Sequence, residues 1–287
     1  MTHHHDTTEI DWDVMAPLLE RGAELHRPAH QQAAAWITER IPVAGVRRIL
    51  DIGSGPGVVT CLLAEAFPYA EVVAVDASPA LLDRARQRAG STGLGDRVRT
   101  HCTELPQGLG ELGDADLIWA GSSLHHIGDQ RAALEGFAGL LRSGGLLALV
   151  EGGLTARHLP RDTGIGSPDL EARLDEAGAE WFNEMRAKLP GAKREVEDWR
   201  ALLAAVGLAP SGTRSFLLDL PAPLPHAVRE QLVAHFTRLR EIFADRLAAD
   251  DAATLDLLLT PEDPRGLLLR DDTFLLTART VYTARRG

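Results

Sequence analysis

The chain has 287 residues and a formal net charge of −11 at pH 7, with 45% hydrophobic and 25% charged residues. These fractions are close to the average of globular proteins, which excludes a disordered or a fibrous chain. Because an acidic chain without a long run of Lys and Arg repels phosphate backbones, we expect no nucleic acid partner.

Neither a membrane segment nor an export signal is expected. The longest apolar stretches, such as residues 146–150, are far shorter than the roughly 20 residues that cross a bilayer. The first dozen residues lack the cationic start and the apolar middle of a signal peptide. Cys61 and Cys102 are expected to be free thiols, as is usual in a reducing compartment. The sequence therefore predicts a cytoplasmic protein.

From residue 46 onward, short apolar runs alternate with segments of helical periodicity, which is the pattern of a parallel sheet covered by helices. Strands are predicted at residues 46–52, 71–76, 97–101, 116–120 and 146–151. Helices are predicted between them at residues 58–67, 79–89 and 130–141. Since continuous apolar runs suit strands that are buried on both faces, these strands should form the centre of the sheet.

The second half of the chain does not continue this regular alternation of strands and helices. Residues 152–166 are rich in Gly, Arg and Pro and are predicted to be a loop. Further helices are predicted at residues 170–185, 196–206 and 228–247, and further strands at 215–220 and 273–284. Near the amino terminus, residues 23–40 are predicted to be helical.

These patterns divide the chain into three parts. Residues 1–45 form an amino-terminal helical segment, and residues 46–153 form a core of alternating strands and helices. Residues 154–287 hold helical insertions, at 154–212 and 221–272, together with the last two strands.

The most informative stretch is residues 49–57, in which a strand ends in alternating glycines and leads into a helix. Such a turn lets a ligand approach the backbone and face the N–H groups of the helix. The dinucleotide fingerprint G-x-G-x-x-G is not matched, because Val58 stands at its last glycine. Asp51 lies at the end of the strand, where it would repel a pyrophosphate and attract a cation.

A second carboxylate ends the next predicted strand at Asp76. At the tip of a neighbouring strand, a carboxylate can accept hydrogen bonds from both hydroxyls of a ribose. The expected ligand therefore carries a ribose and a positive charge but no phosphate. S-adenosylmethionine, with an adenosine, a sulfonium and an amino group, fits this description.

Residues 46–153 resemble the class I S-adenosylmethionine-dependent methyltransferases. The resemblance is carried by the glycine-rich residues 51–57, the ribose segment 75–79, the fourth strand 116–120 and the turn 142–145. It implies an α/β fold with a Rossmann-like, seven-stranded, mostly parallel sheet, an antiparallel last strand and helices on both faces. Residues 46–153 would then bind the cofactor, and the helical insertions would shape the acceptor pocket.

The resemblance also implies which residues bind S-adenosylmethionine. Its predicted binding residues are Asp51, Gly53, Ser54, Gly55, Asp76, Ala77, Ser78, Cys102, Thr103, Ala120 and Gly121.

Each group of these residues would have its own part of the cofactor. The glycine-rich loop would line the methionine part, and Asp76 would bind the ribose. Residues 77–78 would lie near the adenine, and the backbone of residues 120–121 would bind the amino group. Many relatives have an aspartate that meets the adenine where this chain has His101. Adenine recognition is therefore expected to shift to residues 102–103.

The catalytic candidates lie at the predicted strand ends. Because a sulfonium methyl is a strong electrophile, the protein need mainly align an acceptor and, where the acceptor is protonated, remove a proton. His125 and His126 follow the fourth strand, and Glu151 ends the fifth. A histidine pKa near neutrality suits a base, although histidines in such a loop can also serve packing or capping.

Four apolar side chains are candidates for the acceptor pocket, namely Trp12, Met15, Trp181 and Met185, with ordinary burial as the alternative. Apart from the run of histidines at residues 3–5, which suits a flexible terminus, no His/Cys cluster has the spacing of metal ligands, so no metal is expected.

The sequence thus predicts an enzyme that transfers methyl to a small-molecule acceptor, such as a secondary metabolite, by in-line displacement at the sulfonium methyl. Whether oxygen, nitrogen or carbon accepts the methyl group stays open. The alternatives are a protein of the same fold that binds S-adenosylmethionine or S-adenosylhomocysteine without catalysis, and an NAD-linked oxidoreductase.

Overall fold

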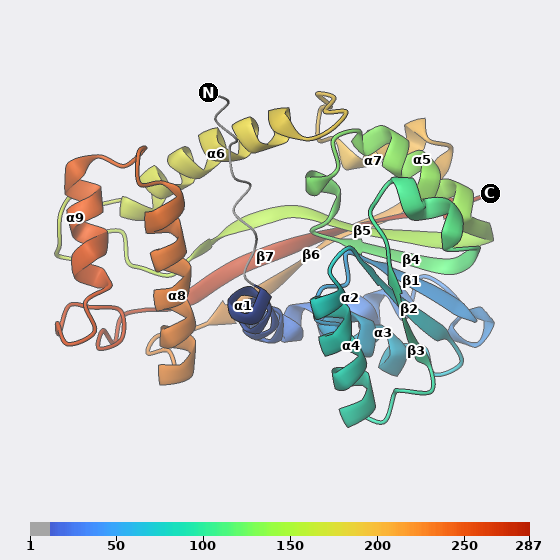
Figure 1. The fold of residues 1–287 in the computed structure, drawn as a ribbon, viewed down its shortest axis with the longest axis horizontal. Coiled ribbons are helices and arrows are strands. Elements are labelled where there is room, and N and C mark those ends of the chain that lie inside the picture. Colours follow the sequence, from blue (N-terminus) through green and yellow to red (C-terminus); the bar gives the residue numbers. More distant parts are fainter. Residues whose placement is uncertain (1–11) are drawn as a thin grey trace, which may run out of the picture.

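The computed structural model describes residues 12–287 of the chain, with side chains from Met15 onward. Its centre is a seven-stranded sheet in the order β3-β2-β1-β4-β5-β7-β6, as Figure 1 shows. The strands are β1 (Arg48–Ile52), β2 (Glu71–Asp76), β3 (Val98–Cys102), β4 (Ala115–Gly121), β5 (Leu141–Arg157), β6 (Leu208–Leu220) and β7 (Leu275–Arg286). Strands β1 to β5 pair in parallel, whereas β7 runs antiparallel to both β5 and β6. The predicted Rossmann-like fold class is confirmed.

Helices cover both faces of this sheet (Figure 1). They are α1 (Trp12–Leu25), α2 (Arg27–Thr38), α3 (Val58–Ala66), α4 (Pro79–Ser91), α5 (Gln130–Leu140), α6 (Leu170–Lys188), α7 (Trp199–Ala205), α8 (His226–Ile242) and α9 (Ala249–Leu258). Trp36 of α2 belongs to one buried cluster with Trp119 of β4. Phe137 of α5 belongs to another with Ile118 of the same strand. Consecutive residues of β4 are thus buried on opposite faces, which explains the continuous apolar runs of the central strands.

A third buried cluster joins α6, α8 and α9 through residues such as Leu174, Phe236 and Leu255. Figure 1 shows these helices at one end of the long strands β5, β6 and β7. Strand β5 runs through residue 153 to Arg157, so the predicted boundary at that residue falls inside a strand. The division of the chain at residues 45 and 153 stays a prediction.

The prediction of a loop over residues 152–166 is wrong in its first part. Strand β5 continues because Gly153, Leu154 and Arg157 pair with residues of β7. The register shifts between Val150 and Gly153, so the glycines form a bulge instead of ending the strand. The turn that we predicted before residue 146 also lies within β5.

Two helical predictions are corrected by the structure. The region predicted as one helix at residues 23–40 is two helices, α1 and α2. The break between them lies next to Pro28 in the first turn of α2, because proline has no N–H with which to continue the hydrogen bonds of α1. The single helix predicted at residues 228–247 ends at Ile242, and the following α9 was not predicted. Helix α9 buries Asp251, which pairs with Arg173 of α6 at 2.7 Å, so its buried face is not marked by apolar residues alone.

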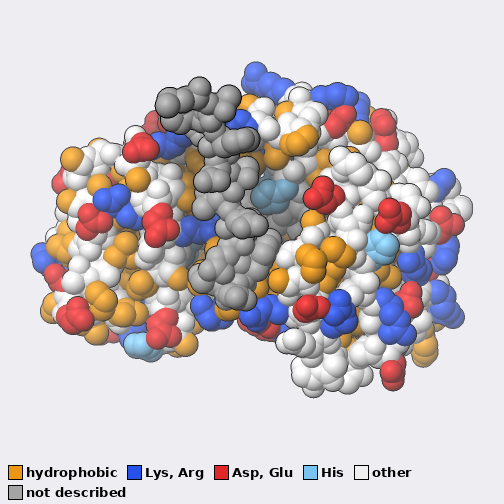
Figure 2. Space-filling view, viewed as in Figure 1, with side chains coloured by type: hydrophobic (Ala, Val, Ile, Leu, Met, Phe, Trp, Pro, Cys, Tyr) orange, Lys and Arg blue, Asp and Glu red, His pale blue; other side chains and the backbone are white. Residues whose placement is uncertain are grey.

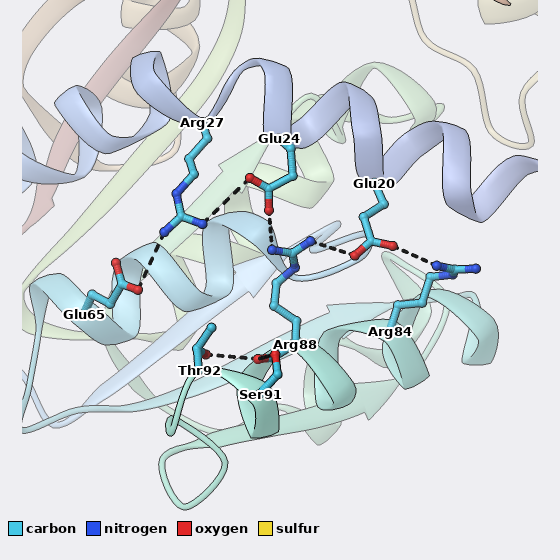
Figure 3. A network of polar contacts seen from close by, with 8 residues as sticks. All are labelled: Glu20, Glu24, Arg27, Glu65, Arg84, Arg88, Ser91 and Thr92. Atoms are coloured by element: carbon cyan, nitrogen blue, oxygen red, sulfur yellow. Dashed lines mark hydrogen bonds and ion pairs between the residues drawn. The ribbon is translucent and has the colours of Figure 1, made fainter. Parts of the chain in front are cut away.

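Helix α1 is tied to α4 by a network of ion pairs, shown in Figure 3. Glu20 accepts from Arg84 at 2.7 Å and from Arg88 at 2.6 Å, and Glu24 also pairs with Arg88. The side chain of Arg88 is only 13% exposed, so solvent screens these pairs less than it screens ordinary surface pairs. The network holds α1 over the edge of the sheet where β1 and β2 end.

Candidate active site

A cavity of about 630 Å³ lies at the carboxyl ends of the parallel strands. Its wall includes residues from the ends of β1, β2 and β4 and from the loops that follow them. Leu19 and Ala23 of α1 and His30 of α2 line it from the other side. The volume lies within the range of about 300–1,000 Å³ that is usual for small-molecule sites. Open α/β sheets bind their ligands at this edge.

The glycine-rich loop after β1 forms one wall of the cavity. The backbone N–H groups of Gly53 and Ser54 both donate to the carbonyl of Val75 on β2, at 2.9 and 3.0 Å. These bonds tie the loop to the neighbouring strand. The loop then enters α3, whose first residues have no side-chain cap.

Asp51 lies at the base of the cavity and is 2% exposed. Its Oδ2 accepts a hydrogen bond of 2.6 Å from the hydroxyl of Thr60 on α3. Burial raises the pKa of Asp51 to about 7; the Thr60 hydrogen bond acts in the opposite direction, and the nearby charge of Asp76 adds to the rise. A buried carboxyl that titrates near neutrality would be stabilised in its ionised form by a cationic ligand.

Asp76 is half-buried and faces the same cavity. Its Oδ2 accepts from the backbone N–H of Gly55, and its Oδ1 accepts from that of Ser78, both at 2.9 Å. Each carboxylate oxygen has a further lone pair for a ligand. The two backbone bonds therefore fix the carboxylate in the wall without using up its capacity as an acceptor.

Two hydroxyls in the cavity wall lack a partner. Ser54 Oγ and Ser123 Oγ are buried and make no hydrogen bond with any described residue. Because buried polar groups are normally paired, these hydroxyls point to a polar ligand in the cavity. The amino acid part of S-adenosylmethionine would supply such groups, so the residues present fit this cofactor.

The cavity brings together most of the predicted cofactor residues but not all. Those that line it are Asp51, Gly53, Ser54, Gly55, Asp76, Ala77, Thr103 and Gly121. Ser78 instead caps α4 by accepting from Leu81 N–H at 3.4 Å. Cys102 is exposed, with its Sγ 3.6 Å from the carbonyl of Ala77, and Ala120 is buried in the core. None of these three lines the cavity, and their predicted contacts with the cofactor stay untested.

Of the three catalytic candidates, His126 alone lines the cavity. Burial lowers its pKa, so its imidazole is neutral at pH 7. His125 and Glu151 lie behind it and contact each other, with Nδ1 to Oε2 at 3.1 Å. Glu151 Oε1 also accepts from Leu124 N–H at 2.9 Å. The pair thus anchors the loop that presents His126.

Arg186 of α6 holds the same loop from outside. Its Nη1 donates to the carbonyls of His125 and Ile127, at 2.9 and 2.6 Å. The sequence gives no sign of this contact, because about sixty residues separate the two segments and neither carries a motif.

Of the predicted acceptor residues, Met15, Trp181 and Met185 do not line the cavity. The thioether of Met15 lies 3.2 Å from Arg238 of α8, and Trp181 packs against the cluster of α6, α8 and α9. Met185 is likewise outside the lining, and the side chain of Trp12 lies outside the described part of the chain. Residues that were not predicted complete the wall, among them Leu19, Ala23, His30, Glu104, Leu105, Trp119, Ser122 and Ile127.

On the face seen in Figure 2, acidic and basic side chains are interspersed instead of forming one broad patch. None of the helices within residues 12–287 combines the length and the apolar character that a membrane span requires. No group of metal-binding side chains is found among the same residues.

Comparison with known proteins supports the assignment of the fold. Residues 50–147 match a methyltransferase domain family. The chain is 29% identical over 286 residues to trans-aconitate 2-methyltransferase of Methylobacterium nodulans. This alignment covers 94% of this chain and 99% of that protein. It is 32% identical over 214 residues to release factor glutamine methyltransferase of Deinococcus radiodurans, covering 69% of this chain and 74% of that protein.

Other matches are partial. The chain spans about half or less of several further trans-aconitate 2-methyltransferases, 42% in the one from Methylobacterium radiotolerans. The solved structure of the cyclase SpnF shares the fold, with a TM-score of 0.50 at 20% identity over 90% of this chain and 81% of that one. The chain belongs to the class I S-adenosylmethionine-dependent methyltransferases. The cofactor of this class of enzymes is S-adenosylmethionine.

Proposed function

We propose that this protein transfers the methyl group of S-adenosylmethionine to a carboxylate oxygen of a small organic acid. The observation that carries the proposal is the match to a trans-aconitate 2-methyltransferase over nearly the whole of both chains. The cavity supports it, because His30 and Leu19 from outside the cofactor core close over the carboxyl edge and leave room for a small acceptor. A tricarboxylic acid such as trans-aconitate is the acceptor class that we expect.

The chain would bind the cofactor through the residues that face the cavity. Asp76 would accept from the ribose hydroxyls, and the hydroxyls of Ser54 and Ser123 would pair with the amino acid part. Asp51 would balance the positive charge of the ligand. When bound, S-adenosylmethionine supplies a methyl group on a positively charged sulfur, which is an electrophile without further activation.

The remaining task of the protein is to position the acceptor. One carboxylate oxygen forms a bond to the methyl carbon while the bond from sulfur to that carbon breaks, and the sulfur keeps the electron pair. Because carboxylic acids have pKa values of about 4, the acceptor is already ionised at pH 7 and no base is needed. His126, neutral in the cavity wall, would orient the acid or exclude water instead of removing a proton.

This role is tested by the His125→Ala, His126→Ala double variant. With labelled cofactor and trans-aconitate, we expect the wild type to form a labelled methyl ester. The double variant should keep turnover within about tenfold, since loss of a general base typically costs 10²–10⁴-fold. Rates measured from pH 6 to pH 9 should be nearly flat at saturating cofactor.

A loss of turnover beyond about a hundredfold in the double variant would argue for an acceptor that must be deprotonated. Failure of the wild type to methylate any organic acid, with labelled product from amines or alcohols instead, would contradict the carboxylate assignment. Absence of labelled product from many acceptors and extracts would favour a protein that binds the cofactor without transferring methyl. The fold alone admits this alternative, because fold does not determine chemistry.

The titration of Asp51 predicts how cofactor binding depends on pH. With its pKa at about 7 in the free protein, Asp51 is increasingly protonated below that pH, and binding of a cation must then release the proton. The dissociation constant of S-adenosylmethionine should therefore rise as pH falls below 7, approaching tenfold per pH unit, and should level off above pH 8. Titration calorimetry at pH 5.5, 7 and 8.5 measures this, and an Asp51→Asn variant should show a flatter profile. If the dissociation constant depends on pH equally in the wild type and in Asp51→Asn, the titration of Asp51 is not the cause of the pH dependence.

A further inference from the structure

Arg279 occupies the middle of β7, which is hydrogen-bonded to a strand on each side. It pairs with Gly153 of β5 and with Phe216 of β6. The glycine opposite it has no side chain, and a Cβ at that position would lie 3.1 Å from the Cα of Arg279. The position opposite Arg279 on β5 therefore contributes no side chain beside the arginine.

The strand register places Arg279 on the cavity side of the sheet. Alternation along β7 puts it on the same face as Val281, which pairs with the cavity-lining Val150 of β5. Phe216, its partner on β6, packs edge-on against Trp36 of α2 on this face, with ring centroids 5.9 Å apart. Arg279 thus lies just beyond the Val150–Val281 pair, toward the carboxyl end of β5, next to the cavity wall but not among the residues that line it.

The guanidinium of Arg279 is largely removed from water and has no counter-ion among the side chains of residues 15–287. Burial lowers its pKa, and the charge of Glu151 opposes this change without forming an ion pair with it. The carboxylate of Glu151 is bonded to His125 and to the N–H of Leu124. Within residues 15–287, Arg279 forms no ion pair or hydrogen bond through its side chain.

The other titratable groups that face Arg279 add no negative charge. His26 and His30, from the junction of α1 and α2, lie within electrostatic range, and burial lowers the pKa of both, that of His30 to about 4. At pH 7 these imidazoles are neutral. Among the described residues, this side of the site therefore holds one positive charge without an ion-pair partner, within electrostatic range of His30, which lines the cavity.

We infer that Arg279 binds a carboxylate of the acceptor and thereby selects acids with more than one carboxylate. A buried charge without a partner is costly, and a chain that retains one at the edge of a ligand cavity gains by supplying it to an anionic ligand. The planar guanidinium matches a carboxylate through two parallel hydrogen bonds. The inference rests on the proposed function and adds the residue that would determine its specificity.

The carboxylate that Arg279 holds is expected to be one that is not methylated. Two charge-assisted hydrogen bonds occupy lone pairs of both oxygens and withdraw electron density, so a carboxylate in this pair is a weaker nucleophile. A second carboxylate of the same acid would then be free to point at the methyl group. Arg279 would stabilise the bound acid equally in the ground state and in the transition state. Its loss should therefore raise KM more than it lowers kcat.

The test uses Arg279→Gln and Arg279→Lys, with Arg214→Gln as the matched control. Arg214 lies two residues from Phe216 on β6, with its guanidinium 5.2 Å from the same ring, but it is exposed. The probe is trans-aconitate, titrated by calorimetry into protein saturated with S-adenosylhomocysteine, alongside its mono-amides and inorganic phosphate. Thermal unfolding without ligand shows whether each variant folds.

We expect Arg279→Gln to weaken binding of the triacid about 30-fold or more and to raise KM by a similar factor with kcat within about threefold. Arg279→Lys, which keeps the charge without the planar fork, should fall between this variant and the wild type. Arg214→Gln should match the wild type. The affinity for S-adenosylhomocysteine should be unchanged in all variants, and at least one mono-amide should bind the wild type much more weakly than the triacid.

Equal affinity for the triacid in wild type and Arg279→Gln would overturn the inference, even if methyl transfer to the acid is observed. So would a wild type that binds none of the acids, or that binds phosphate as tightly as the triacid. Conversely, triacid binding that depends on Arg279 supports the inference even if the methyl group is transferred to another kind of atom. The two proposals can therefore fail separately.

Discussion

Asp76→Asn should weaken the binding of S-adenosylmethionine by about 100-fold or more, the largest effect on affinity that we expect from a single substitution in the cavity. Hydrogen bonds to a charged acceptor contribute about 1.5–3 kcal/mol each, and two ribose hydroxyls would share this carboxylate. The substitution also disturbs the wall itself, because Gly55 N–H and Ser78 N–H both donate to Asp76. An amide offers one oxygen, so one of these donors would face an NH₂ group.

The matched control for this substitution is Glu104→Gln. Glu104 is another carboxylate in the lining of the same cavity, but it is exposed and forms no part of the ribose segment. Calorimetric titration of both variants with S-adenosylmethionine should give a loss of less than about threefold for Glu104→Gln. A similar small loss for Asp76→Asn, with the fold intact by circular dichroism, would show that the ribose is bound elsewhere.

The parallel half of the fold could be predicted because its signals are local. Strand β2 has the predicted bounds at residues 71–76, and β4 extends the predicted 116–120 by one residue at each end. Both are buried on two faces, so the apolar run in the sequence is the strand itself. Strand β5 was longer than predicted because its second half is held by β7, whose residues lie more than a hundred positions away. No local pattern carries that pairing.

The same distinction holds for the cavity. Asp51 and Asp76 could be predicted because each ends a strand whose position follows from its own sequence, and parallel strands end at one edge. Leu19, Ala23 and His30 could not, since they reach the cavity only after α1 packs on α4 through Glu20, Glu24 and Arg88. Arg279 was missed for a related reason. A charged residue in the last strand is ordinary in a sequence, and only the register with Gly153 and Phe216 places it on the cavity face.

Gly57→Ala should lower the free energy of unfolding by about 2–5 kcal/mol, the largest effect on stability that we expect. Gly57 has φ +77°, in the left-handed region, where a side chain costs about 1–2 kcal/mol. A Cβ there would also lie 2.6 Å from Ala85 Cβ and 2.8 Å from Ala85 Cα on α4. This contact involves the backbone of α4, and Ala85 packs with Ala74 and Leu82. The clash can therefore be removed only if α4 moves away from the sheet. Such overpacking typically costs a further 1–3 kcal/mol.

Gly55→Ala separates the two contributions. Gly55 also has a left-handed φ, +53°, but a Cβ there would meet nothing within 4 Å, so its variant should lose only the conformational part, about 1–2 kcal/mol. Both variants are compared by denaturant unfolding without ligand, since Gly55 lines the cavity and its substitution would also affect binding. If both variants lose the same free energy of unfolding, α4 can move to accommodate the added Cβ without a loss of stability. In that case the close contact between the glycine-rich loop and α4 would not contribute to the rigidity of the cofactor site.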